Sequence, residues 1–338
     1  MYIMKNVLYV GNALSKSGKN ITSIETLSQH LSEAYNVKTA SSRSNIILRL
    51  LDMIGLVLRN ESKTDIVLID TYSTLNFYYT LIISQICRLF TLEYIPILHG
   101  GDLESRLKNS PKISKLIFNN AEFLVSPSNF LKSKFEAYGY KNVVFIPNSI
   151  EIDNYEFMAR DIDSIKLLWV RSISELYNPK LAILVLEALI AKGYKAELTM
   201  VGPDNNDYLK EVKQFTLNKN LNVNFTGKLT KLEWILLSKT HNMFLNTTNF
   251  DNAPVSIIEA MALGLPIVST NVGGLPFLIE DYSEGILVEP EDEEAMVQAI
   301  ITLRNDKVLK DRLVINGRKK AETFNWLHIK PSWISLLQ

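Results

Sequence analysis

FDNAPVSIIEAMALGLPIVST, residues 250–270, contains in order a polar loop, a helix that starts near Ser256, a Gly-Leu-Pro break and a short apolar strand. Two acids, Asp251 and Glu259, stand eight positions apart on either side of the helix start. Ser256 and Glu259 also fit the S-x-x-E capping box, whose side chains satisfy backbone N–H groups and contribute about 1 kcal/mol. The stretch alone leaves two interpretations open, a ligand site and a structural helix cap.

The composition is that of an ordinary globular protein. The chain has 338 residues, of which 47% are hydrophobic and 21% charged, and its length suggests two domains. A single cysteine, Cys87, excludes an internal disulfide framework and is typical of a reducing compartment. The early apolar run VLYV is too short for a signal-peptide core, and the uncharged stretch 71–87 is too polar for a spanning helix. We therefore expect a cytoplasmic protein.

Short apolar runs alternate with helical patterns along the whole chain. The predicted strands are 7–10, 66–69, 94–98, 123–125, 143–146, 166–170, 197–201, 223–225, 243–246, 266–269 and 285–288. Strands separated by helices are typical of βαβ units, so we expect an α/β protein with two Rossmann-like domains facing an interdomain cleft. We place the domains at 1–157 and 158–323, with a helix at 324–338 that crosses back to the first.

Ligands of such sheets bind beyond the carboxyl ends of the strands. Polar or glycine-bearing segments follow several predicted strands, at 10–20, 98–102, 169–180, 201–207, 225–230 and 246–256. Several common sites are excluded there by spacing. Gly11 and Gly18 are too far apart for a P-loop, and no G-x-G-x-x-G follows a strand. The pair Asp161 and Asp163 precedes a strand, and the four histidines lack zinc-ligand spacing, so we expect no metal site.

With the neighbouring residues included, a family resemblance emerges. The segment NFDNAPVSIIEAMALGLPIVSTNVGGLPFLIEDYSEGILVEPED, residues 249–292, resembles the donor-binding segment of glycosyltransferase family 4, of the bacterial group 1 type. Weaker similarity continues through HGGD at 99–102, SPSNFLKSKFEAYG at 126–139 and VVFIPNSIE at 143–151. The resemblance implies a GT-B fold and a retaining enzyme that uses a nucleotide-sugar donor, without cofactor or metal.

The resemblance also implies roles for individual residues. In that family, the second acid of an E-x7-E pattern binds the ribose hydroxyls and the first approaches the donor sugar. Glu259 matches the second acid, and Asp251 stands at the first, a departure that shortens the side chain by one methylene. Arg171 follows a strand where the family places an arginine on the diphosphate, and a fixed guanidinium suits the charge that develops on a leaving diphosphate. The family's following lysine has its first available counterpart in Lys180, which could instead begin a helix after Pro179.

Further positions complete the expected site. His99, before two glycines, corresponds to a family histidine that contacts the donor sugar or supports the reacting centre. We expect the catalytic residues to be His99, Arg171 and Asp251. The expected donor-binding residues are Gly18, Arg171, Lys180, Gly202, Lys228, Leu229, Val255, Ser256 and Glu259. Gly202 could equally be a simple turn after a strand.

The most specific function that these residues predict is a metal-independent hexosyltransferase. It would move a sugar from a nucleotide-sugar to a glycan, lipid-linked or polysaccharide acceptor, with no nucleic-acid partner. Two alternatives remain open, a sugar-nucleotide epimerase of the same fold and a non-catalytic partner subunit. Residues 1–150 carry 16 Lys and Arg against 11 Asp and Glu. Lys112 and Lys115 in the helix PKISKLIF could therefore rest on an anionic membrane surface, although a solvated helix explains them equally well.

Overall fold

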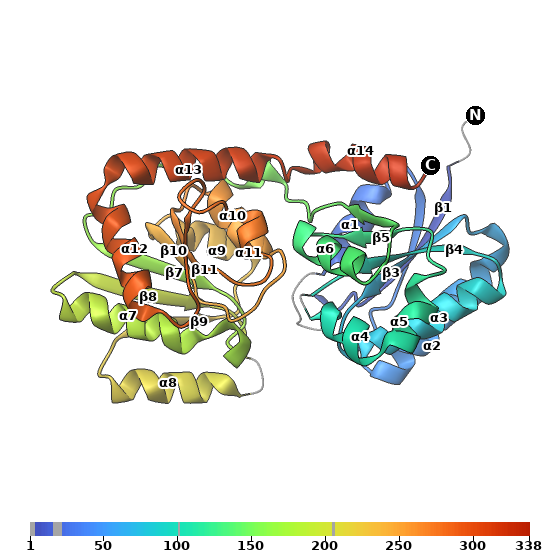
Figure 1. The fold of residues 1–338 in the computed structure, drawn as a ribbon, viewed down its shortest axis with the longest axis horizontal. Helices are drawn as coiled ribbons and strands as arrows, with labels where there is room; N and C mark the ends of the chain where they lie inside the picture. Colours follow the sequence, from blue (N-terminus) through green and yellow to red (C-terminus); the bar gives the residue numbers. More distant parts are fainter. Residues whose placement is uncertain (1–3, 16–21, 101, 205–206) are drawn as a thin grey trace. The chain divides into compact units, whose positions relative to one another are not determined.

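The computed structural model describes residues 4–15, 22–100, 102–204 and 207–338. These residues form two compact units, one of Met1–Asn148 with Ile329–Gln338 and one of Ser149–His328. Each unit contains a six-stranded sheet in which every strand pair is parallel. The predicted α/β class is therefore confirmed (Figure 1).

The sheet of the first unit has the strand order β2-β1-β3-β4-β5-β6. Its strands are β1 (Asn6–Val10), β2 (Asn36–Ala40), β3 (Ile66–Thr71), β4 (Glu93–Leu98), β5 (Leu124–Ser126) and β6 (Val143–Phe145). Its helices are α1 (Ser23–Leu31), α2 (Ile46–Asn60), α3 (Asn76–Leu89), α4 (Leu103–Asn109), α5 (Pro111–Phe118) and α6 (Asn129–Ala137). All six residues of β3 are buried, because this strand lies inside the sheet with helices packed against it.

The sheet of the second unit has the strand order β12-β11-β10-β7-β8-β9. Its strands are β7 (Ile165–Val170), β8 (Ala196–Val201), β9 (Val223–Gly227), β10 (Met243–Asn246), β11 (Ile267–Thr270) and β12 (Ile286–Val288). Its helices are α7 (Pro179–Ala191), α8 (Tyr208–Asn218), α9 (Lys231–Ser238), α10 (Val255–Ala262), α11 (Leu275–Leu278), α12 (Glu293–Asn305) and α13 (Lys307–Glu322). Leu167 and Trp169 of β7 enter one apolar cluster and Leu168 enters another, so both faces of this sheet are covered.

The division between the units falls after Asn148, earlier than the boundary that we expected at residue 157. Ile150, Ile152 and Tyr155 are buried in the apolar cluster around α10, which fixes this segment to the second unit. The last helix, α14 (Trp326–Leu336), continues from the second unit into the residues of the first. There Tyr35 donates a hydrogen bond to the Ile334 carbonyl at 3.3 Å.

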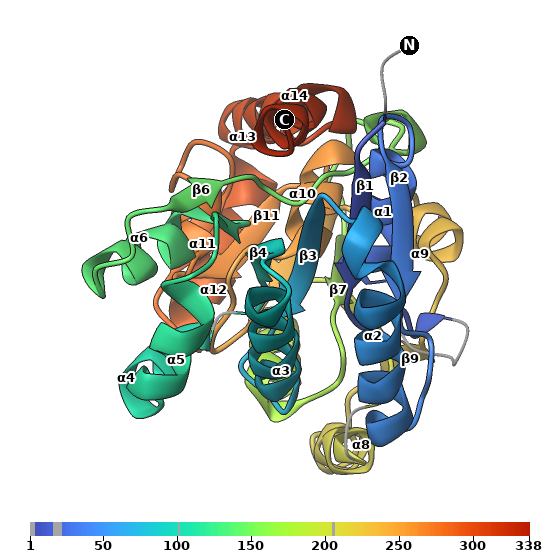
Figure 2. The same cartoon turned by 90° about the vertical axis from the view of Figure 1, so that its right-hand side faces the viewer.

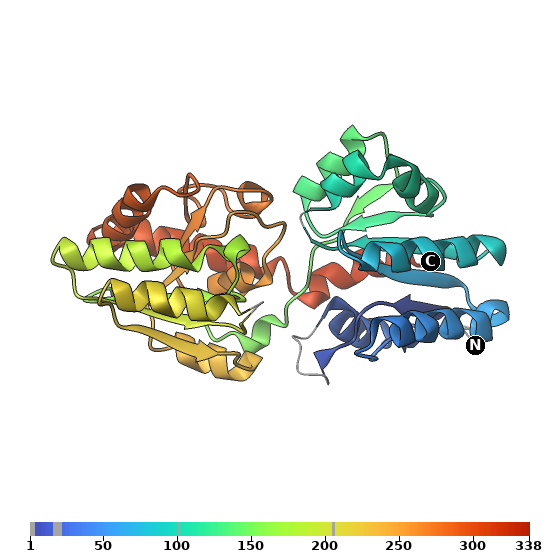
Figure 3. The same cartoon turned by 90° about the horizontal axis from the view of Figure 1, so that it is seen from below.

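Helices α2 and α3 pack against each other in the first unit. Figure 2 shows α2 and α3 side by side in the first unit, and Figure 3 shows them again from below.

Among the described residues, no helix is both long and apolar enough to cross a membrane. Within the same ranges, no group of three or more His, Cys, Asp and Glu side chains could hold a metal ion.

Candidate functional site

Arg171 and Asp251 meet at the carboxyl edge of the second sheet. Arg171 directly follows β7, and Asp251 lies in the loop after β10, the neighbouring strand. Their Nη2 and Oδ2 atoms are 2.7 Å apart, and both side chains are largely buried. Tyr177 lies under the guanidinium at 5.1 Å, and burial is the main reason that the pKa of its hydroxyl is raised. Two residues that the sequence predicts for one site are thus in direct contact.

The contact between Arg171 and Asp251 is an ion pair that lacks hydrogen-bond alignment. Both Nη2 and Oδ2 are buried without a hydrogen-bond partner, although they are close to each other. The hydroxyls of Ser174 and Ser256 are also buried without a partner. Ser174 lies in the loop that Arg171 begins, and Ser256 lies in the first turn of α10. Four polar atoms of this edge therefore keep hydrogen-bonding capacity that buried groups rarely leave unused.

Gly202 holds the Arg171 segment in place. It follows β8 with φ +155°, and a Cβ built on it would lie 1.7 Å from the Arg171 carbonyl oxygen. The Arg171 amide donates to the Val201 carbonyl at 2.9 Å, so the two backbones run in contact at this point. Only glycine fits such a close approach. Gly202 is therefore required by the close backbone contact with Arg171, which agrees with its interpretation as a turn after a strand.

Glu259 is a buried acid held by two partners that the sequence did not suggest. Its Oε1 accepts hydrogen bonds from the Tyr155 hydroxyl at 2.8 Å and from the Lys231 ammonium. The Glu259 side chain is 4% exposed, whereas that of Lys231 is 48% exposed. Burial, and then the charge of Glu259, raise the pKa of Tyr155 well above its usual value, so this hydroxyl remains a donor.

The helix-cap interpretation of Glu259 is wrong. The N-cap of α10 is Pro254, whose side chain has no hydrogen-bonding atom, and Ser256 makes no capping bond. A genuine capping box stands at α9, where Glu233 reaches back to the backbone N–H of Thr230 at 2.7 Å. Glu259 is therefore available as a site residue.

The remaining expected residues of the second unit lie in different surroundings. Lys180 contacts Glu211 of α8 at 2.5 Å, and this hydrogen bond raises its pKa. The Lys180 side chain is therefore directed toward α8, and among the described residues no ion pair or hydrogen bond joins it to Arg171 or Asp251. Lys228 is exposed after β9, while Leu229 and Val255 pack against the apolar cluster around α10. Gly18 lies outside the described residues.

A second polar centre occupies the carboxyl edge of the first sheet. His99 follows β4, and its Nε2 is 2.7 Å from Oδ1 of Asp70, the penultimate residue of β3. The Tyr9 hydroxyl donates to the same oxygen at 2.7 Å, and the Tyr72 ring stacks on His99 at 5.0 Å. Burial and the Asp70 charge raise the pKa of both tyrosines. His99 is 7% exposed, and its ring is held by the contact with Asp70 and by the stacked Tyr72 ring.

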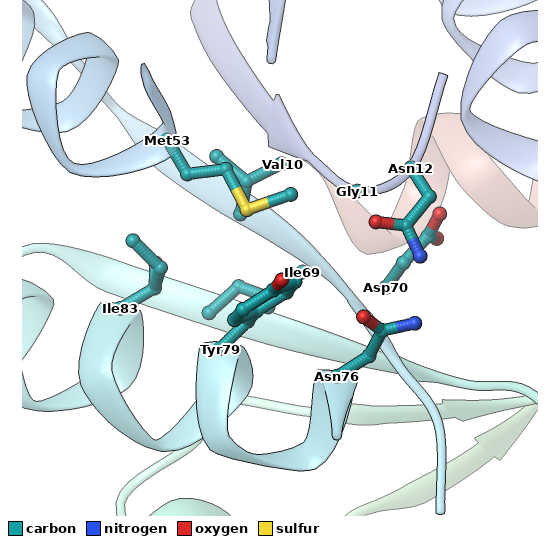
Figure 4. Close-up of a pocket in the computed structure, with 9 residues that line it drawn as sticks. All are labelled: Val10, Gly11, Asn12, Met53, Ile69, Asp70, Asn76, Tyr79 and Ile83. Carbon is teal, nitrogen blue, oxygen red and sulfur yellow. The ribbon is translucent and has the colours of Figure 1, made fainter. Parts of the chain in front are cut away.

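Asp70 also lines a small cavity of about 10 Å³ (Figure 4). Asn12 and Asn76 contribute its other polar walls, and Met53 and Ile83 lie among its apolar ones. The Oδ2 atom of Asp70 is buried without a partner. A space of this size is close to the minimum that holds one water molecule. The cavity thus serves the Asp70 carboxylate and is too small for a sugar.

Comparisons with known proteins agree with the fold and with the segment that carries the second edge. Residues 156–320, just under half of the chain, match the family model of Glycosyl transferases group 1. Spinach (Spinacia oleracea) sucrose-phosphate synthase is 35% identical over 91 residues, which make up 27% of this chain and 9% of that protein. The chain therefore aligns with only a small part of such relatives.

Two solved structures share the fold over nearly all of the chain. Sucrose-phosphate synthase of Thermosynechococcus elongatus superposes with a TM-score of 0.82 at 16% identity, over 98% of each chain. The Anabaena protein Alr3699/HepE in complex with UDP and glucose gives 0.77 at 16% identity, over 98% of this chain and 99% of that one. At this identity the likeness shows the fold alone, which is GT-B as predicted.

Proposed function

We propose that this protein is a nucleotide-sugar-dependent glycosyltransferase of family 4 that transfers a hexosyl group. The observation that carries the proposal is the set of four unpartnered buried polar atoms on Arg171, Ser174, Asp251 and Ser256. All four lie inside the segment that matches the group 1 model. A diphosphate offers acceptor oxygens to the three donors of this set, the Arg171 guanidinium and the hydroxyls of Ser174 and Ser256.

Arg171 has the central role in this proposal. The diphosphate competes with Asp251 for the guanidinium, and a bidentate fork gains more from two phosphate oxygens than from a misaligned carboxylate. Once released, Asp251 is free to accept hydrogen bonds from the hydroxyls of the donor sugar. The N-terminus of α10 adds backbone N–H groups with a favourable dipole. Negative charge on the leaving diphosphate is thereby stabilised as the glycosidic bond breaks.

Glu259 would bind the ribose, and its two partners would set its orientation. Tyr155 and Lys231 both contact Oε1, which leaves Oε2 for a vicinal hydroxyl pair. Gly202, Lys228 and Leu229 are proposed to border the base. In this proposal Asp251 binds the donor sugar and Glu259 binds the ribose.

The first unit would supply the acceptor side. We propose that His99 contacts the donor sugar, while Asp70 fixes which imidazole nitrogen carries a proton. Gly18 is proposed to belong to the same side. The acceptor oxygen would form a bond to the anomeric carbon on the face that the diphosphate leaves, and its proton would pass to the departing phosphate oxygen. The anomeric configuration would therefore be retained.

The proposal includes metal independence, a cytoplasmic location and a glycan or lipid-linked acceptor of the kind used in polysaccharide synthesis. Activity should survive EDTA, since Arg171 and the N-terminus of α10 take the place of a cation. A requirement for Mn²⁺ or Mg²⁺ would contradict this part. Release of an inverted free sugar without acceptor would instead indicate a sugar-nucleotide epimerase.

The test is a thermal-shift panel of UDP-, GDP-, ADP- and dTDP-sugars, followed by NMR of the product anomer. A donor held at about 100 times its Kd stabilises the fold by about 2.7 kcal/mol, which is readily measured. We expect one nucleotide class to stabilise the protein and the product to keep the donor's anomeric configuration. If no nucleotide raises the melting temperature, a non-catalytic subunit becomes the better description.

A further inference from the structure

The helix α2 has an apolar face that the first unit leaves uncovered. Its core side is ordinary, with Met53 and Val57 at 2% and 0% exposure. On the other side, Ile47, Leu51 and Leu58 are 69%, 57% and 46% exposed. Spacings of four and seven residues place these three side chains along one line on a helix. Solvent-facing positions of a helix are ordinarily polar, so this stripe needs a partner.

The apolar stripe continues at the beginning of the neighbouring helix α3. The Tyr79 hydroxyl donates to the Ile46 carbonyl at 3.1 Å, which joins the two helix starts. Leu75 and Tyr78 are exposed at this junction, at 62% and 41%. Arg106 of α4 lies 5.6 Å from the Tyr78 ring, so a cation borders the apolar surface. We call the exposed side chains of α2 and the α3 start the α2 face.

The helices of this layer are strongly basic. Together α2, α3, α4 and α5 contain seven Lys and Arg, of which Arg49 is buried, but only two Asp and Glu, and one of these, Glu104, contacts Lys134. Gln85 of α3 donates to the Leu116 carbonyl at 3.2 Å, which places α5 beside α3 (Figure 2). Lys112 and Lys115 are exposed on that helix. Apolar and basic side chains thus share one layer of the first unit.

Helix α5, for which the sequence suggested a contact with a membrane surface, exposes little apolar area. Ile117 and Phe118 of α5 are fully buried, and only Leu116 among its large apolar residues is exposed. This helix therefore offers lysines but little apolar area. The α2 face supplies the area, and the basic helices beside it supply the charge.

We propose that the α2 face docks on an anionic lipid bilayer. Apolar side chains would enter the boundary between headgroups and acyl chains, while Arg106, Lys112 and Lys115 would face anionic headgroups. The excess of basic residues favours a bilayer over a second copy of the same basic face, which would repel itself. Arg49 of α2 donates to Asn12 at 2.9 Å, so the docked helix is tied to the edge that holds Asp70 and His99. A lipid-linked acceptor would reach that edge from the membrane.

The test is cosedimentation of the full chain with vesicles of phosphatidylcholine alone or mixed with phosphatidylglycerol. We expect binding to the anionic vesicles at low salt and a marked loss at high salt. Ile47→Ser/Leu51→Ser should lower the partition coefficient at least about ten-fold, because two apolar side chains leave the lipid. The matched control is Leu232→Ser/Leu236→Ser on α9, whose side chains are similarly spaced and exposed at 66% and 53%. It should bind like the unmodified protein.

A second variant tests the proposal without changing any residue of α2. Lys112→Glu/Lys115→Glu should weaken binding to anionic vesicles, with the melting temperature unchanged. Absence of binding at low salt, or an Ile47→Ser/Leu51→Ser variant that binds normally, overturns the proposal. A dimer in light scattering that this variant converts to a monomer, without vesicle binding by the unmodified protein, would show that a second copy covers the face. No nucleotide-sugar is present in this assay, so its outcome is separate from that of the glycosyltransferase proposal.

Discussion

The carboxyl edges of the two sheets use buried charge in opposite ways. In the first unit, one oxygen of Asp70 accepts from Tyr9 and lies against His99, so the imidazole has a single orientation. In the second unit, Arg171 and Asp251 touch without a hydrogen bond, and the hydroxyls of Ser174, in the loop that Arg171 begins, and Ser256, in the first turn of α10, lack partners. The first edge holds its own side chains in place through Oδ1 of Asp70, and its unpartnered atom, Oδ2 of Asp70, lines a cavity too small for a sugar. At the second edge, the ion pair between Arg171 and Asp251 can be replaced by hydrogen bonds to a ligand, as a binding site requires.

The comparison predicts its largest effect at Arg171. Arg171→Lys should lower kcat about 10²- to 10³-fold, because a point charge cannot replace a fork on two phosphates. The matched control is Arg304→Lys on α12, since Arg304 also stacks on a tyrosine, Tyr194, at 5.4 Å. Steady-state kinetics of both variants measure the difference. Normal turnover by Arg171→Lys would remove the guanidinium from the mechanism.

A somewhat smaller effect is expected at Glu259. Glu259→Ala should weaken donor binding by roughly 1.5–3 kcal/mol, because a charge-assisted hydrogen bond to the donor is lost. Glu233→Ala removes a genuine helix cap and should cost about 1 kcal/mol of stability without a change in donor affinity. Calorimetric titration and thermal melts of the two variants separate these effects. The assignment fails if both variants bind the donor equally well.

Asp70 provides the sharpest test of the first edge. Asp70→Asn keeps the size of the side chain but offers His99 an amide, so the ring loses its fixed tautomer. We expect kcat to fall about ten-fold with little change in donor affinity. Long-range ¹H–¹⁵N spectra of the histidine side chains should show the change of tautomer. The control is Asp65→Asn, whose carboxylate accepts from the Asn6 amide at 2.7 Å just before β3; an equal loss of kcat there would contradict a specific role for Asp70.

The smallest effect concerns His241, which lies at the opposite edge of the second sheet, just before β10. Burial lowers its pKa below the usual 6.5, so the folded state prefers the neutral ring. The unfolded chain binds the proton more readily, and stability should therefore fall as pH drops below about 6.5, by at most about 1.4 kcal/mol per pH unit. His241→Gln should flatten this slope in urea melts between pH 7 and 5. An unchanged slope would assign the acid sensitivity to other groups.

Much of the fold was predictable because buried parallel strands are continuous apolar runs. The strand that sequence reasoning missed, β2, lies at the edge of its sheet and exposes most of its residues, so its sequence NVKTA lacks an apolar pattern. The helix expected at 324–338 corresponds to α14 at Trp326–Leu336, in which Trp326 and Trp333 are buried.

The candidate site was predictable where its residues belong to a short motif or stand directly after a strand. Asp251 and Glu259 belong to one short motif, and Arg171 stands directly after a strand. Asp70, Tyr155 and Lys231 escaped notice because each acts through a partner that is distant in sequence. Tyr155 and Glu259, for example, are 104 positions apart. The α2 face escaped for a different reason, since exposed and buried apolar residues look alike in a sequence.

The division of roles between the two edges is tested most directly by calorimetric titration of the best donor into the unmodified protein, Glu259→Ala and Asp70→Asn. If the second edge binds the donor and the first acts on the bound sugar, Glu259→Ala should lose at least about ten-fold in affinity, whereas Asp70→Asn should stay within about two-fold of the unmodified protein. Normal binding by Glu259→Ala, or an equal loss in both variants, would contradict that division of roles.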